Sequence, residues 1–129
     1  MSDGVIVADA SAILALLKQE PFDEFAPRRL FGATISAVNF SEVLERLCSG
    51  GLRGEEADAA VEELGLRVIS FDATQARAAA RLRVATRQAG LSLADRACLA
   101  LGLALDRPVV TADRIWASLD VGVEILLIR

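Results

Sequence analysis

One short segment near the start of the chain constrains the fold more than any other. Residues 4–8 form an apolar run without alternation, Gly-Val-Ile-Val-Ala, and Asp9 follows it directly. Such a run is typical of a strand buried on both faces, as in the middle of a parallel sheet. Helical composition begins at once after Asp9, so this aspartate lies at the carboxyl end of the strand, where open α/β sheets bind ligands.

The rest of the chain alternates expected strands with expected helices. Further strands are expected at 34–36, 66–71, 108–111 and 123–128. Helices are expected from the first strand to about residue 19, then over 21–29, 38–48, 54–64, 72–90, 92–105 and 113–119. Strands that alternate with helices require a parallel sheet with helices on both faces. The sequence therefore predicts one domain over residues 1–129, a three-layer α/β/α sandwich around a mainly parallel five-stranded sheet.

The composition limits the chemistry that such a domain can perform. The chain contains no histidine and no tyrosine, which excludes imidazole acid–base catalysis, Ser-His-Asp nucleophiles and most zinc sites. Cys48 and Cys98 each fall within an apolar helical pattern, so both are expected to be buried. No apolar run approaches the ~20 residues of a membrane span, and the N-terminus lacks the basic region of a signal peptide. We therefore expect a cytoplasmic protein without membrane association.

The charged residues are unevenly distributed. The formal net charge of −4 by itself disfavours a nucleic-acid partner. One segment nevertheless has no acidic residue between Asp72 and Asp95 and contains four arginines: Arg77, Arg81, Arg83 and Arg87. Arg77 and Arg81 share one helical face, as do the other two. This helix is interpreted either as a solvated surface or as a track for RNA phosphates.

Four carboxylates are candidates for a common site. Asp9 and Asp113 each follow a strand and precede a helix, and a parallel sheet brings such strand ends to one edge. Asp95 begins an apolar helix, and Glu42 lies opposite the apolar stripe of its own helix. Simple helix capping explains the aspartates, and a solvated helix face explains Glu42. The sequence pattern alone leaves both interpretations open.

Carboxylates that share a pocket repel one another by several kcal/mol, at an effective dielectric of ~20 and a separation of ~4 Å. They must take up protons or bind a cation. Ligands that are all oxygen select a hard ion such as Mg²⁺ or Mn²⁺. Such an ion acidifies a bound water and neutralises charge on a phosphate. A shared site would therefore suit a phosphodiesterase that works without histidine.

Four segments, taken in order, resemble the motifs of PIN-domain nucleases, and the size and sequence are most similar to the VapC toxins of bacterial toxin–antitoxin pairs. The segments are VADAS at 7–11, SAVNFSEV at 36–43, LADRA at 93–97 and TAD at 111–113. The resemblance covers essentially the whole chain. It also selects Glu42 over Glu45 as the family's glutamate.

The resemblance implies a Mg-dependent endoribonuclease toxin that a small VapB-like antitoxin neutralises. Its catalytic and metal-binding residues would be Asp9, Glu42, Asp95 and Asp113. These would hold one or two Mg²⁺ ions, or Mn²⁺, with Ser11 and Thr111 in support. Separately from the resemblance, the phosphate-track interpretation of the basic helix makes Arg77 and Arg81 the candidate RNA contacts.

The resemblance further implies a homodimer, because VapC-like proteins commonly pair through helices near the first and middle motifs. Four residues are candidates for an exposed apolar patch: Leu14, Leu17, Phe22 and Phe25.

Two other classes of function are considered. A receiver-type signalling domain would phosphorylate an aspartate after the third strand, where Asp72 stands, but it needs a lysine after the last strand. The one lysine of this chain is Lys18. A PIN-like module that has lost catalysis and binds other proteins is the second alternative. The four intact carboxylates argue against it.

Overall fold

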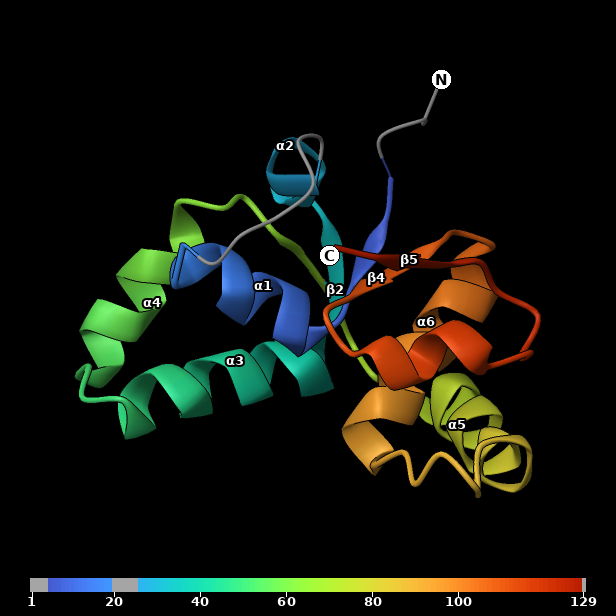
Figure 1. The fold of residues 1–129 in the computed structure, drawn as a ribbon. Coiled ribbons are helices and arrows are strands. Elements are labelled where there is room, and N and C mark those ends of the chain that lie inside the picture. The colour runs from blue at the N-terminus through green and yellow to red at the C-terminus, as the bar shows by residue number, and fades with distance from the viewer. Residues whose placement is uncertain (1–4, 20–25, 129) are drawn as a thin grey trace.

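Five short parallel strands form the centre of the molecule in a computed structural model, which describes residues 5–19 and 26–128 (Figure 1). The strands are β1 (Val7–Ala8), β2 (Thr34–Ser36), β3 (Arg67–Ile69), β4 (Val109–Thr111) and β5 (Ile125–Leu127). Their order across the sheet is β3-β2-β1-β4-β5, and every neighbouring pair is parallel. Strand β1 is therefore central, as its unalternating apolar sequence predicts.

Helices connect these strands in the expected order. They are α1 (Ala10–Leu17), α2 (Ala26–Leu30), α3 (Ala37–Ser49), α4 (Gly54–Glu62), α5 (Ala73–Ala85) and α6 (Leu93–Leu105), with a 3₁₀ helix η1 (Arg114–Ser118). Part of the helix expected over 21–29 lies outside the described residues. Helix α5 ends before the expected Gly90, because Thr86 is its C-cap and the Thr86 hydroxyl donates to the Leu82 carbonyl at 2.7 Å.

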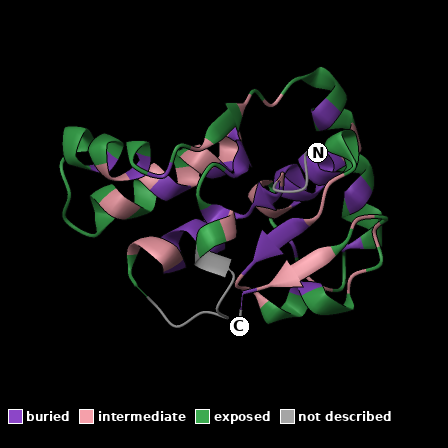
Figure 2. Cartoon of the chain, turned by 90° about the horizontal axis from the view of Figure 1, so that it is seen from above, coloured by how far each residue is buried: buried purple, intermediate pink, exposed green. Residues whose placement is uncertain are grey.

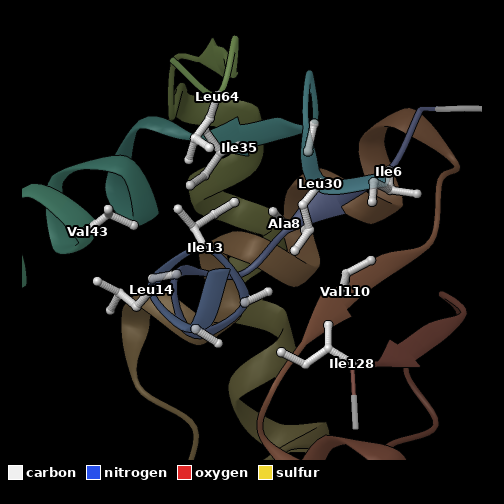
Figure 3. Close-up of a cluster of buried hydrophobic side chains, with 14 of the residues drawn as sticks. Ile6, Ala8, Ile13, Leu14, Leu30, Ile35, Val43, Leu64, Val110 and Ile128 are labelled. Atoms are coloured by element: carbon white, nitrogen blue, oxygen red, sulfur yellow. The ribbon is translucent and has the colours of Figure 1, made fainter. Parts of the chain in front are cut away.

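The sheet separates two apolar cores. At β1, Ala8 and the preceding Ile6 face one core, and Val7 faces the other. Helices α1 to α4 cover the first core, which Figure 3 shows, and α5, α6 and η1 cover the second. Because both faces are covered, the prediction of a three-layer α/β/α sandwich is confirmed.

Helices α3 and α4 form a hairpin that projects from the body of the molecule, and its far end is largely exposed (Figures 1 and 2). Cys48 lies in the last turn of α3 and is exposed, whereas Cys98 in α6 is buried. The expectation of two buried cysteines is therefore wrong for Cys48. Val43 of α3 is buried in the first core, and three other residues of the apolar stripe are half-buried against it: Phe40, Leu44 and Leu47. Cys48 therefore lies beside the apolar stripe and not within it.

The residues expected to form an exposed apolar patch differ in their environment. Leu14 is buried in the first core, and Leu17 is half-buried against it. Phe22 and Phe25 lie outside the described residues. Leu14 therefore belongs to the core rather than to an exposed patch.

The strand order also distinguishes this fold from a receiver domain. In receiver domains the third strand lies beside the first, in the order 2-1-3-4-5. Here β4 lies beside β1, and β3 is at the sheet edge. Asp72 caps α5 by accepting the Gln75 backbone N–H at 2.9 Å. Within residues 5–19 and 26–128, no helix combines the length and apolar character needed to cross a bilayer.

Candidate active site

Asp9 lies at the junction between β1 and α1, at the carboxyl end of the central strand. Its backbone N–H donates to the Val110 carbonyl at 2.9 Å, which continues the pairing of β1 with β4. Asp9 occupies the N-cap position of α1, but its carboxylate makes no capping hydrogen bond to that helix. Capping therefore does not explain the carboxylate, although the sequence allowed that interpretation.

Two hydroxyl groups hold the Asp9 carboxylate instead. Ser11 Oγ donates to Asp9 Oδ2 at 2.6 Å, and Thr111 Oγ1 donates to the same oxygen at 2.9 Å. Each hydroxyl also accepts a backbone N–H, Ser11 from Ala112 and Thr111 from Asp113, both at 3.0 Å. These bonds fix the orientation of the carboxylate across β1 and β4. Oδ1 receives neither hydroxyl proton.

The Asp9 side chain is only 4% exposed, and burial raises its pKa above the ordinary value. The hydrogen bonds from Ser11 and Thr111 act in the opposite direction, and the negative charge of Asp95 raises the pKa further. Desolvation disfavours the charged form of a carboxylate, and a nearby carboxylate adds to this effect. The ionised form of Asp9 is therefore electrostatically unfavourable without a cation.

Glu42 is brought to the same place by α3, which begins directly after β2. Ser36 caps this helix by accepting the Val38 N–H at 3.2 Å. Burial raises the pKa of Glu42, and the charges of Asp9 and Asp95 raise it further. The charge of Arg46 partly opposes them. Glu42 is half-buried whereas Glu45 is exposed, so Glu42 lies toward the site and Glu45 faces solvent.

Asp95 both caps a helix and contributes charge to the site. Its Oδ2 accepts the Ser92 N–H at 3.0 Å, and its own N–H donates to Ser92 Oγ at 3.1 Å, which forms the expected capping box of α6. The Asp95 charge also raises the pKa values of both Asp9 and Glu42. The capping interpretation and the site interpretation therefore hold together for this residue.

Cys98, one turn further along α6, confirms that these three carboxylates surround one region. Burial raises the pKa of its thiol well above the ordinary value, and the next causes are the charges of Asp9, Asp95 and Glu42. Cys98 is fully buried, so the thiol lies beneath the carboxylates and not among groups that a substrate reaches.

Asp113 lies near Asp9, but its carboxylate is directed toward the helix that follows it. Its Oδ1 accepts the Ile115 N–H at 3.0 Å and so caps η1. Its charge is not among the causes that shift the pKa of Asp9 or Glu42. The structure therefore brings Asp9, Glu42 and Asp95 together and places Asp113 at the margin of this group.

The arrangement also depends on Asn39, which the sequence interpretation did not select as a site residue. Its Nδ2 donates to the Ala94 carbonyl at 2.9 Å and ties α3 to the first turn of α6. The side chain is fully buried. This bond holds the helix of Glu42 beside the helix of Asp95. The signal that could have selected Asn39 was its place in the family-like segment 36–43.

Arg77 and Arg81 are exposed on α5, as expected for either a solvated face or a phosphate track.

Comparison with known proteins identifies the family. A model of the PIN domain matches residues 6–122, which is most of the chain. The protein therefore belongs to the PIN domain family. A comparison with curated proteins gives no significant match.

Several solved structures share the fold. A chain of VapBC2 from Rickettsia felis, bound to a DNA fragment from its promoter, has a TM-score of 0.76 at 14% identity, covering 97% of this chain and 99% of that one. DNA-bound VapBC from Salmonella typhimurium has a TM-score of 0.74 at 21% identity, with 95% and 96% covered. VapC20 from Mycobacterium tuberculosis, a sarcin-ricin loop cleaving toxin, has a TM-score of 0.68 at 20% identity, with 92% and 98% covered.

Membership of this family supports nuclease chemistry in general, and PIN domains generally use divalent metal ions. The donor chemistry here fits such an ion, because carboxylate oxygens are what hard divalent cations prefer and two of these carboxylates are destabilised when ionised. Among the described residues, however, no group of three or more His, Cys, Asp or Glu side chains is arranged so that it could hold a metal ion. The carboxylates thus gather at one edge of the sheet without forming a complete ligand cage.

Proposed function

We propose that the protein is a metal-dependent endoribonuclease that hydrolyses RNA phosphodiester bonds. The observation that carries this proposal is the environment of Asp9. Its buried carboxylate lies at the carboxyl end of the central strand and experiences the charge of Asp95, and no described basic side chain is among the groups that shift its pKa. A site of this kind attracts a cation and, through it, a phosphate.

In this proposal four carboxylates hold one or two Mg²⁺ ions, or Mn²⁺: Asp9, Glu42, Asp95 and Asp113. Ions bound in this way lower the pKa of a coordinated water and neutralise charge on the reacting phosphate. Ser11 and Thr111 orient Asp9 so that Oδ1 is left for a ligand. The capping box similarly fixes Asp95 through its Oδ2.

The experiment that tests this proposal is RNA cleavage by the purified protein with and without Mg²⁺, with chemical mapping of the product ends. Water is the proposed nucleophile, so the 2′-hydroxyl takes no part and the products should carry 5′-phosphate and 3′-hydroxyl groups. A substrate with 2′-deoxyribose at the cleaved position should therefore still be cut. Cleavage that persists in EDTA, or products with 2′,3′-cyclic phosphates, would contradict the mechanism.

Arg77 and Arg81 are proposed to bind phosphates of the RNA. Both are exposed and lie one turn apart on α5, in a segment without acidic residues. Replacing both with alanine should weaken RNA binding and flatten its dependence on salt concentration. An unchanged salt dependence would assign both residues to a solvated face.

We also propose that the protein is the toxin of a toxin–antitoxin pair, acts in the cytoplasm and forms a homodimer. The support is the shared fold with chains from VapBC complexes and from a toxin–antitoxin complex of Klebsiella pneumoniae. A small VapB-like antitoxin should be encoded beside it and should suppress growth arrest when both are expressed. Light scattering of the isolated protein at micromolar concentration should give the mass of a dimer, and a monomer would refute that part.

A second candidate function is a PIN-domain module that has lost catalysis and binds another protein. The absence of a complete metal-binding group among the described residues favours it. Calorimetric titration of Mg²⁺ or Mn²⁺ into the wild type and into Asp9→Ala separates the two functions. A catalytic site should bind the ion in a way that depends on Asp9, whereas the degenerate module should bind none.

A further inference from the structure

A cleft lies where α5 ends and α6 begins, and Figure 1 shows these two helices at its lower right. Its volume is about 230 Å³, and three arginines are among the residues that line it: Arg83, Arg87 and Arg96. Thr86 and Ser92 also line it, and no aspartate or glutamate does. The lining is therefore strongly basic in a protein whose net charge is −4.

Arg96 provides the most specific observation. Its side chain is 9% exposed, and its Nη1 donates to the Ala79 carbonyl at 2.9 Å. Its Nε–H is buried and has no hydrogen-bond partner, and no described acidic side chain forms an ion pair with it. A buried guanidinium without a counter-charge is costly, so such groups are normally paired. A bound anion would supply the missing partner.

Arg83 and Arg87 add two exposed donors to this buried one. Arg83 lies in the last turn of α5 and Arg87 follows the C-cap residue Thr86, and both side chains are exposed. Within the described part of the chain, neither forms an ion pair with an acidic residue. Guanidinium groups match the geometry of phosphate oxygens and often bind them through two N–H groups. The three side chains together therefore suit a phosphate group.

The cleft is also connected to the candidate active site. Ser92 lines the cleft, and its backbone N–H donates to Oδ2 of Asp95 at 3.0 Å. Arg77 and Arg81 lie nearer the start of α5 and on a different face of that helix from Arg83, so they do not enlarge this cleft. A phosphate site beside the proposed nuclease site suits a phosphate of the substrate chain better than a free anion.

We infer that this cleft binds a backbone phosphate of the RNA that flanks the cleaved bond, an inference that rests on the proposed ribonuclease function. Arg96 is the buried donor, and Arg83 at the end of α5 and Arg87 just after it close over the phosphate. The cleft thereby sets the direction in which the RNA chain leaves the carboxylates.

The test measures RNA binding without catalysis. Fluorescence anisotropy of a labelled single-stranded RNA is recorded in EDTA over a series of KCl concentrations, for the wild type and for Arg83→Ala/Arg87→Ala. We expect about tenfold weaker binding at low salt and a salt slope smaller by about 0.7 for each phosphate that the variant no longer neutralises. Arg28→Ala is the matched control, because Arg28 is an exposed arginine on α2, at the opposite end of the sheet.

Arg96→Lys tests the buried donor while keeping its charge. The variant should fold and should bind RNA more weakly than the wild type, because lysine lacks the fork of N–H groups. If it fails to fold, the Arg83→Ala/Arg87→Ala result decides the matter alone. An effect of that double variant equal to the Arg28→Ala effect would overturn the inference.

Inorganic phosphate distinguishes the source of the anion. If phosphate raises the Tm of the wild type but not of Arg83→Ala/Arg87→Ala, and RNA binding is the same for both, the cleft takes a free anion and the inference is wrong. If the wild type cleaves no RNA with Mg²⁺ but the double variant still shows weaker, less salt-dependent binding, the proposed catalysis fails and the phosphate site stands.

Discussion

The junctions β1–α1 and β4–η1 share the dipeptide Ala-Asp and use their aspartates differently. Ala8-Asp9 stands at the end of β1, Ala112-Asp113 follows β4, and the two strands are hydrogen-bonded neighbours. Asp113 caps the helix that it precedes. Asp9 leaves its helix uncapped and accepts hydroxyl protons from Ser11 and Thr111.

The difference follows from what surrounds each carboxylate. Asp9 follows the central strand and is enclosed by α3 and α6, so its carboxylate is buried among other carboxylates. Asp113 precedes a short 3₁₀ helix and is half-buried. Position in the sheet, and not the local sequence, decides which aspartate is removed from solvent.

The largest expected effect is on the rate of RNA cleavage, and it should differ between variants of Asp9 and Asp113. Asp9→Asn should lower the rate of RNA cleavage by more than about 100-fold, because it removes the charge at the centre of the site. Asp113→Asn should lower it by about tenfold, since asparagine preserves the helix cap. Single-turnover cleavage with Mg²⁺ measures both. Equal losses would show that the two junctions contribute equally, contrary to the geometry.

Glu42→Gln changes the surroundings of Asp9 while leaving both junctions intact. It removes one of the charges beside Asp9, so metal affinity and cleavage should fall by about tenfold or more while stability holds or rises. Glu45→Gln is the matched control on the same helix, and it should alter stability by no more than about 0.5 kcal/mol and leave cleavage unchanged. Calorimetric Mg²⁺ titration and cleavage rates measure these effects. Similar losses from both variants would place Glu42 outside the site.

Ser11→Ala tests the bonds that hold Asp9. It removes the 2.6 Å hydrogen bond to Oδ2, one of the contacts that lower the Asp9 pKa. Cleavage should fall by about tenfold, and the acidic limb of the pH–rate profile should move to higher pH. Ser49→Ala, an exposed serine at the end of α3, should change neither. A lower cleavage rate with an unchanged pH–rate profile would mean that Ser11 supports cleavage without changing the pKa of Asp9.

The smallest effect is on stability. Because the folded-state pKa of Asp9 is raised, the stability that its protonated form provides is fully present below about pH 4 and is lost as pH rises through the raised pKa. In EDTA near pH 8, Asp9→Asn should therefore melt about 3 °C above the wild type. The gap should close as the pH is lowered toward 4. Thermal melts across this range measure it, and a gap that is independent of pH would contradict the assigned cause.

The sequence predicted helices and strands well where interactions between neighbouring residues determine them. The unalternating apolar run at 4–8 indicated β1 and its central place, and the Ser92–Asp95 capping box marked the start of α6. Strand order depends on pairing between distant segments, so the identity of the strands beside β1, which are β2 and β4, needed the structure. The division into a single domain over residues 1–129 stays a prediction.

The candidate site was predicted in part. The family resemblance selected Glu42, which periodicity alone assigned to solvent, and the structure places it beside Asp9 and Asp95. The roles of the predicted site residues remain proposals. The Asn39 bond to α6 joins residues 55 apart in sequence, and Cys48 is exposed although its neighbour Leu47 packs against the first core. Neither is encoded in a local pattern.

The position of Trp116 provides a built-in optical probe. It is the one tryptophan of the chain, it is fully buried in η1, and its backbone N–H donates to the Asp113 carbonyl at 3.1 Å. Its intrinsic emission therefore comes from a single place, directly behind the β4–η1 junction. A shift in that emission when a divalent ion or an antitoxin is added would locate the disturbance at this junction without any attached dye.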